Sequence, residues 1–171
     1  MKKIKKNKNL ENKKMITKNQ VLAAQDEWGS GVVKIGSLKD NRIECETFAS
    51  TFLDIRYTFE EGNVLFKPTK CSHEQFRPTK EQALSYFIAG DDRVCKEDTG
   101  FAINPWTNVR FENTGMILEE NRAIAIGNYY FTDLEGNETK VEYTFGYKLI
   151  DGNLKIDLHH SSFPYNPVPA A

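Results

Sequence analysis

The sequence predicts an α+β domain in which helices come first and a meander of antiparallel strands follows. Apolar residues recur at helical spacing in three N-terminal segments, whereas from residue 101 onward they alternate with polar residues at the period of a strand. Short turns rich in Gly, Asn and Asp separate the later segments, which favours antiparallel neighbours. This order is typical of helices packed on one face of an antiparallel sheet.

Composition narrows the class of protein. With 171 residues, of which 39% are apolar, the chain is large enough to bury a core, and its net charge of −1 argues against a nucleic-acid-binding face. No run of about 18 apolar residues occurs, so no membrane span is expected. The cysteines Cys45, Cys71 and Cys95 are odd in number and form no CxxC motif, which predicts free thiols in a reducing compartment.

Residues 1–16 are rich in lysine and asparagine and lack the apolar core of a signal peptide. We expect a solvated, mobile tail here, followed by a single domain over residues 17–171. The absence of a recognisable signal predicts a cytoplasmic location.

The first predicted helix begins after Thr17, a candidate N-cap, and its apolar stripe includes Trp28, which we expect in the core. Gly29 and Gly31 predict an interruption, after which the helix resumes through residues 32–35.

Two further helices are predicted. The second spans residues 45–57, where Phe48, Phe52 and Ile55 recur at helical spacing. The third spans residues 81–88 behind a capping box formed by residues 79–82.

The strands begin with a short segment over residues 64–69, which Pro68 must end or confine to a sheet edge. Strands over residues 106–113, 116–118 and 123–132 follow. The last element is a long hairpin over residues 140–163, with Asp-Gly at its type I′ turn.

This hairpin ends in the run His159-His160-Ser161-Ser162, the main candidate for a site. Strand parity places His159 with Ser161 on one face and His160 with Ser162 on the other, so the two histidines cannot chelate one ion from a regular strand. Along a strand, the Cβ atoms of Asp157 and His159, and those of His159 and Ser161, are about 6–7 Å apart, which is too far for a nucleophilic triad. The pattern alone favours a simpler alternative, a buried structural histidine and serines that hydrogen-bond the strand end.

Three segments carry a resemblance to a known family. GFAINPWTNVRFENTG (100–115), AIGNYYFTDLEGNETKVEYTFGY (125–147) and DLHHSSFPYNP (157–167) resemble the iota-class carbonic anhydrases. That class is similar to the association domain of calcium/calmodulin-dependent kinase II and shares its NTF2-like cone. The resemblance runs from Gln20 to the C-terminus. It implies helices on the concave face of a strongly curved antiparallel sheet, with a pocket between them.

The resemblance also implies a reaction, the reversible hydration of carbon dioxide to bicarbonate. The pocket residues of the family match Thr69, Tyr86, His159 and Ser161. Some relatives use zinc or manganese and others no metal, and with three histidines and no acidic cluster beside the motif, this chain resembles the metal-free kind. We therefore expect no cofactor and a small-molecule substrate, with neither nucleic acid nor membrane as partner.

The resemblance further implies a homodimer through the outer face of the sheet, which would bury Leu154, Ile156 and Leu158. Two rival functions stay open. One is a ligand-binding or oligomerisation module of the kinase association-domain type. The other is an isomerase or dehydratase, which would need a buried carboxylate such as Asp157 in the pocket.

Overall fold

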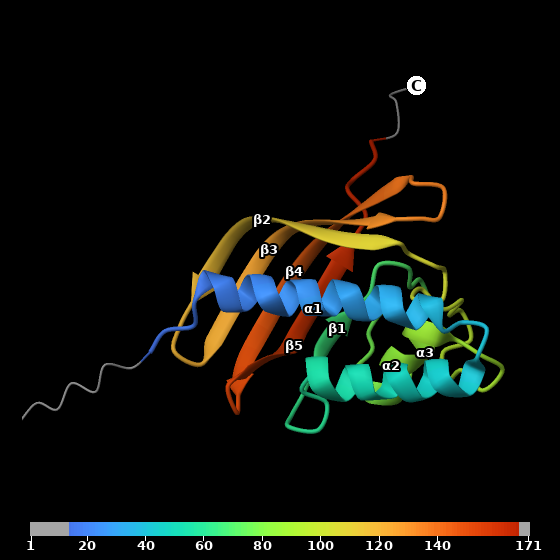
Figure 1. The fold of residues 1–171 in the computed structure, drawn as a ribbon, viewed down its shortest axis with the longest axis horizontal. Coiled ribbons are helices and arrows are strands. Elements are labelled where there is room, and N and C mark those ends of the chain that lie inside the picture. Colours follow the sequence, from blue (N-terminus) through green and yellow to red (C-terminus); the bar gives the residue numbers. More distant parts are fainter. Residues whose placement is uncertain (1–13, 168–171) are drawn as a thin grey trace, which may run out of the picture.

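The computed structural model describes residues 14–167 and shows the predicted order of helices and then long strands (Figure 1). Most of the predicted tail therefore lies outside the described residues. Its last residue, Ile16, is buried, and its backbone N–H donates to the Glu119 carbonyl at 2.8 Å. Ile16 is thus part of the folded domain, one residue before the helix cap at Thr17.

The elements in chain order are α1 (Lys18–Ser37), α2 (Arg42–Arg56), β1 (Leu65–Lys67), α3 (Lys80–Ile88), β2 (Asn108–Leu118), β3 (Arg122–Thr132), β4 (Glu138–Ile150) and β5 (Asn153–Ser162). No helix among residues 14–167 is both long and apolar enough to cross a membrane.

The five strands of the described residues form one sheet in the order β1-β5-β4-β3-β2. β2 to β5 are antiparallel neighbours, as predicted, whereas the short edge strand β1 pairs in parallel with β5. The helices pack against one face of this sheet, with α1 running across the strands (Figure 1). The α+β arrangement is confirmed, but the sheet is not strongly curled, so the strong curvature that the resemblance implied is not confirmed.

α1 is continuous, so the predicted interruption at its glycines is wrong. Glycine occupies both positions because the backbone of α1 passes close to α2 and β2 there. A Cβ on Gly31 would overlap the ring of Phe52 in α2, and a Cβ on Gly29 would lie 3.1 Å from the carbonyl oxygen of Val109 in β2. Glycine in this helix is a packing requirement, and its cost in helix propensity is offset by the close contact it permits.

α2 begins three residues earlier than predicted, at Arg42, because Asn41 caps it. Its buried face is also rotated relative to the prediction: Phe52 is buried with Cys45 and Ala49, whereas Ile55 is 49% exposed. α3 has the predicted capping box, in which the Thr79 hydroxyl accepts from the Gln82 N–H.

Two bulges modify the predicted strands. β2 is one strand of eleven residues, and the break predicted at residues 114–115 is a bulge opposite Gly127. In β5, pairing shifts between Gly146 and Tyr147 of β4, where Leu158 and Ile156 are the partners and Asp157 has none. Such a bulge reverses the side-chain parity on its far side.

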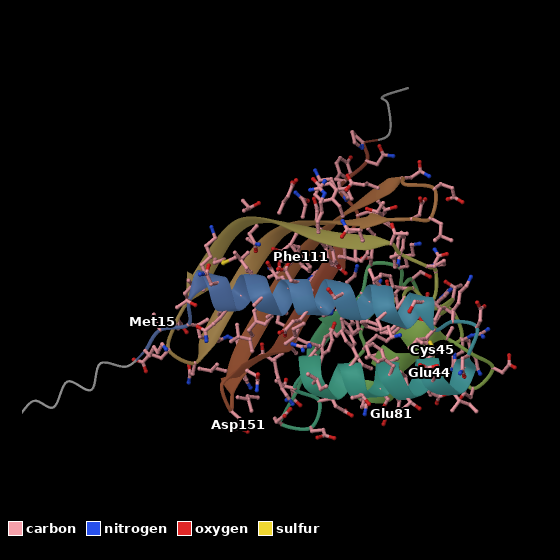
Figure 2. The ribbon with its side chains drawn as sticks, viewed as in Figure 1. Met15, Glu44, Cys45, Glu81, Phe111 and Asp151 are labelled. Atoms are coloured by element: carbon pink, nitrogen blue, oxygen red, sulfur yellow. The ribbon has the colours of Figure 1, made fainter. Side chains whose placement is uncertain are left out.

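The bulge at Asp157 corrects the expected interface. Leu154 and Ile156 belong to the hydrophobic core, on the same side of the sheet as His159 and Ser161. They are therefore unavailable to a partner through the outer face, and only Leu158 stays partly exposed there. The β4–β5 turn itself has the predicted geometry, with φ of 49° at Asp151 and 81° at Gly152, and Figure 2 shows Asp151 at its tip.

Aromatic side chains fill the space between the helices and the sheet. The indole of Trp28, from α1, lies at the centre, within about 6.4 Å, centroid to centroid, of six aromatic rings and of the His159 imidazole. The expectation that Trp28 packs in the core is confirmed, and its central place brings α1 to the end of β5 where the candidate site lies.

Candidate active site

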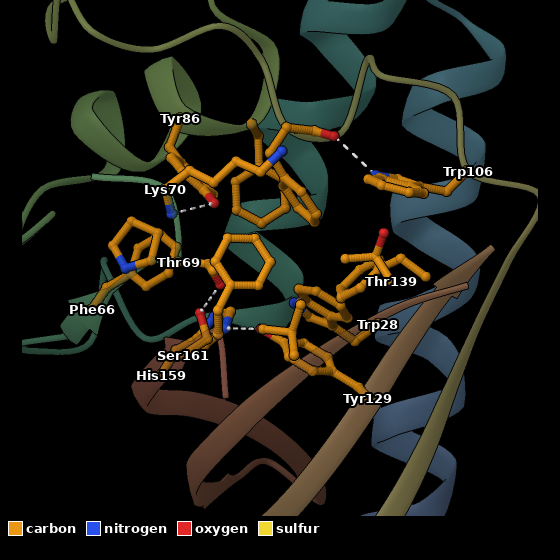
Figure 3. Close-up of a pocket in the computed structure, with 16 residues that line it drawn as sticks. Trp28, Phe66, Thr69, Lys70, Tyr86, Trp106, Tyr129, Thr139, His159 and Ser161 are labelled. Carbon is orange, nitrogen blue, oxygen red and sulfur yellow. Dashed lines mark hydrogen bonds between the residues drawn. The ribbon is translucent and has the colours of Figure 1, made fainter. Parts of the chain in front are cut away.

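A small cavity of about 30 Å³ lies between the helices and the sheet, and all four predicted site residues line it (Figure 3). Such a volume accommodates a water molecule or a solute of a few atoms. Most of its wall is aromatic or aliphatic; the apolar lining includes Phe66, Phe87, Phe101, Trp106, Phe131 and Val141. A few polar atoms in an apolar wall are typical of small-molecule sites.

The end of β5 contributes two of the polar groups. His159 and Ser161 are buried and point into the cavity, whereas His160 is exposed on the other face, so the predicted parity holds at this end of the strand. β5 is fixed here from both sides, because Phe66 of β1 and Phe145 of β4 are the register partners of His159.

Thr69 joins the site from the loop after β1. Its hydroxyl donates to the Ser161 Oγ at 2.9 Å (Figure 3). Pro68 ends β1 at the predicted place, and the chain then turns so that Thr69 lies over the strand end. The ammonium of Lys67, the last residue of β1, donates to the Ser161 carbonyl at 3.1 Å and links the start of this loop to β5.

Tyr86 reaches the cavity from α3. The Lys70 backbone N–H points to its hydroxyl at 3.4 Å, and its ring stacks on Phe101 with a centroid distance of 5.5 Å. Burial raises the pKa of the Tyr86 phenol above 10, so this group is a neutral donor at physiological pH.

The imidazole of His159 has two phenol neighbours. Tyr57 Oη lies 2.9 Å from Nδ1, and Tyr129 Oη lies 3.3 Å from Nε2. The ring also stacks on Phe66, with 4.6 Å between centroids. Burial, with a smaller contribution from His160, lowers the pKa of His159 well below 6.5, so the imidazole is neutral at pH 7.

Sequence reasoning missed Tyr57 and Tyr129. Tyr129 lines the cavity, and burial raises its pKa, while the neighbouring hydroxyls of Ser161 and Thr69 oppose that rise. Its alternation with Phe131 along β3 was a usable signal, since both face inward. Tyr57 gave no such signal, because it follows the last residue of α2 and its backbone pairs with β5 only through an isolated bridge to Ile156.

Asp157 does not line the cavity. Its carboxylate pairs with the Arg122 guanidinium at 2.5 Å, and the Lys148 ammonium lies 3.8 Å away. The Asp157 carboxylate, which a dehydratase-type reaction would need as a base, therefore forms an ion pair outside the cavity.

Within residues 14–167, no group of three or more His, Cys, Asp or Glu side chains has a geometry that could hold a metal ion.

Comparison with known proteins identifies the family. Residues 19–163 match the family model of the metal-independent carbonic anhydrases. A metal-independent carbonic anhydrase from Nostoc sp. is 40% identical over 154 residues, which cover 88% of this chain and 75% of the relative.

Solved structures agree with this match. The crystal structure of a cyanobacterial iota-carbonic anhydrase complexed with bicarbonate superposes with a TM-score of 0.85 at 38% identity, covering 89% of this chain and 94% of the other. A putative dehydratase of the NTF2-like family from Streptomyces avermitilis has a TM-score of 0.55 at 12% identity, covering 86% and 96%, and shares the fold alone. The chain belongs to the metal-independent carbonic anhydrase family, which bears out the expectation that it needs no cofactor.

Proposed function

We propose that this protein catalyses the reversible hydration of carbon dioxide to bicarbonate in the cavity at the end of β5. The observation that carries the proposal is the convergence of three hydroxyls, from Thr69, Tyr86 and Ser161, in one small apolar chamber. Family membership supports it, as does the bicarbonate bound to the cyanobacterial iota-carbonic anhydrase of similar structure.

The hydroxyls supply what the reaction needs without a metal. The oxygen of water bonds to the carbon of carbon dioxide, one C=O π pair moves onto oxygen, and a proton leaves to a base in the solvent. Thr69 and Ser161 hold and orient the water, and Tyr86 donates to an oxygen on which negative charge develops. Donors fixed in a dry site stabilise such charge more than water does, because they need no reorganisation.

In this scheme His159 orients the groups around the reacting water and does not accept its proton. The sequence left two roles open for it, proton acceptor and orienting group. Because burial lowers its pKa well below 6.5, the ring is a weak base at pH 7, which favours the second role. A site without metal-bound hydroxide or a strong base is expected to be slower than a zinc carbonic anhydrase.

Stopped-flow measurement of carbon dioxide hydration tests the proposal. Protein stripped of metal with a chelator and protein loaded with zinc or manganese are compared at equal concentration. We expect both to hydrate carbon dioxide faster than buffer, and at the same rate. If folded protein leaves the buffer rate unchanged in both states, the chain is a binding or oligomerisation module, the rival function that the fold also permits.

We also propose a homodimer through the outer face of the sheet, although its contacts differ from those first expected. Ile117 and Ile126 are more than half exposed on this face. Buried in a self-complementary contact, they would remove apolar surface from water. Sedimentation of the wild type and of Ile126→Glu checks this: we expect a dimer that the substitution dissociates, and a monomeric wild type would contradict it. The cytoplasmic location stays a prediction.

A further inference from the structure

A chain of four buried side chains runs from α1 to the cavity. The Trp28 indole Nε1–H donates to Tyr57 Oη at 3.0 Å, Tyr57 Oη lies 2.9 Å from His159 Nδ1, and Tyr129 Oη lies 3.3 Å from His159 Nε2. Each of the four residues is 3% exposed or less. Figure 3 shows the cavity end of this chain, with a dashed line between His159 and Tyr129 and with Trp28 close to both.

The direction of the hydrogen bonds follows from the donors. An indole N–H can only donate, so Tyr57 Oη accepts from Trp28. The phenol of Tyr57 must then place its own proton, and His159 Nδ1 is the only acceptor it contacts among the described residues. The opposite arrangement, with Nδ1–H donating to Tyr57, would leave a completely buried O–H without an acceptor, which is costly.

This direction fixes the proton on the imidazole. A neutral histidine carries one hydrogen, and if Nδ1 accepts, that hydrogen is on Nε2. Nε2–H then donates to Tyr129, whose own O–H is left for the cavity that Tyr129 lines together with Ser161 and Thr69.

We propose that Trp28 and Tyr57 are positioning residues that hold His159 in its neutral Nε2–H form, so that His159 donates to Tyr129 and leaves the Tyr129 hydroxyl as a further donor to the substrate. The form of His159 is a property of the fold. Its effect on turnover rests on the proposed carbon dioxide hydration. The two parts are therefore tested by different measurements.

Nitrogen NMR tests the first part. His73 and His160 are exposed, so the double variant His73→Gln/His160→Gln leaves His159 as the only histidine. In uniformly ¹⁵N-labelled protein at pH 7, we expect one imidazole nitrogen with the shift of an unprotonated acceptor, Nδ1, and one with the shift of an N–H, Nε2. A protonated Nδ1, or a ring with both nitrogens protonated, would overturn the proposal whatever the enzymatic activity.

Tyr57→Phe tests the cause. The substitution removes the donor to Nδ1 and keeps the ring, so both ¹⁵N signals of His159 should move as the other tautomer becomes accessible. Unchanged signals would refute the role of Tyr57. Tyr147→Phe is a matched control, because its hydroxyl is also buried but makes no hydrogen bond within residues 14–167, and we expect it to leave the signals unchanged.

Kinetics test the consequence. We expect Tyr57→Phe to lower kcat/KM for carbon dioxide hydration by about fivefold, the factor that one buried hydrogen bond is worth, and Tyr147→Phe to retain wild-type turnover. A Tyr57→Phe variant with altered ¹⁵N signals and undiminished turnover would refute the positioning role. A wild type with the Nε2–H form and no hydration activity would instead refute the proposed function and leave the assignment of the proton intact.

Discussion

Ser161→Ala is the substitution that separates catalysis from stability most clearly. Ser161 is buried, lines the cavity and accepts the hydrogen bond of Thr69 at 2.9 Å. If its hydroxyl contacts the reacting oxygens, its removal should lower kcat/KM by about 10²–10³-fold, as the loss of one donor to a developing oxyanion does.

The cost in stability is much smaller. The substitution removes one neutral hydrogen bond, about 1 kcal/mol, which in a domain of this size shifts Tm by about 2–4 °C. Thr69 is only half-buried, so its hydroxyl is not stranded in an apolar interior when the acceptor is lost. Activity should therefore collapse in a protein that still folds.

Ser162→Ala is the matched control. Ser162 is the next residue of the same strand, points to the opposite face and donates to Glu142 Oε2 at 3.1 Å. Stopped-flow rates and thermal unfolding of both variants are compared with the wild type. Equal rates for Ser161→Ala and Ser162→Ala would refute the assignment of the site. Failure of Ser161→Ala to fold would show that the hydroxyl is structural.

Further predictions concern the other site residues and α1. Tyr86→Phe should lower turnover about tenfold or more with little change in Tm, because it removes a cavity hydroxyl and keeps the ring; unchanged turnover would remove Tyr86 from the site. His160→Ala should leave turnover near wild type, because His160 faces away from the cavity. The pKa of His159 is lowered in the folded state, so below about pH 6.5 the unfolded chain binds a proton at this histidine before the folded chain does. The free energy of unfolding should therefore decrease as the pH falls. Urea denaturation across pH 5–7 should show this decrease, and His159→Gln should make it smaller. Gly31→Ala should cost about 1–3 kcal/mol in urea denaturation, since its methyl group would overlap Phe52, and a neutral effect would mean that α1 and α2 separate readily.

Local signals in the sequence predicted most of the elements. The capping box at Thr79, the edge position of the strand ended by Pro68 and the turn at Asp151 all depend on chemistry within a few residues, and all three are present. Strand parity also predicted that His159 and Ser161 share one face, and both are buried on the same side of the sheet, whereas their direction into the pocket was implied only by the family resemblance.

Features that depend on distant contacts were not predicted. The bulge at Asp157 is visible only from the pairing of β5 with β4, and it moved Leu154 and Ile156 from the expected interface into the core. The reason for glycine at position 31 of α1 is the ring of Phe52 in another helix, which leaves no room for a Cβ. The contact of Tyr57 with His159 joins residues 102 apart in the chain, so no local pattern could show it.

The most direct test of the site is a crystal structure of the metal-free protein soaked in bicarbonate. We predict a planar anion in the cavity, with its oxygens within hydrogen-bond distance of Thr69 Oγ1, Tyr86 Oη and Ser161 Oγ. Bicarbonate bound away from these hydroxyls, or held there through a metal ion, would contradict the account.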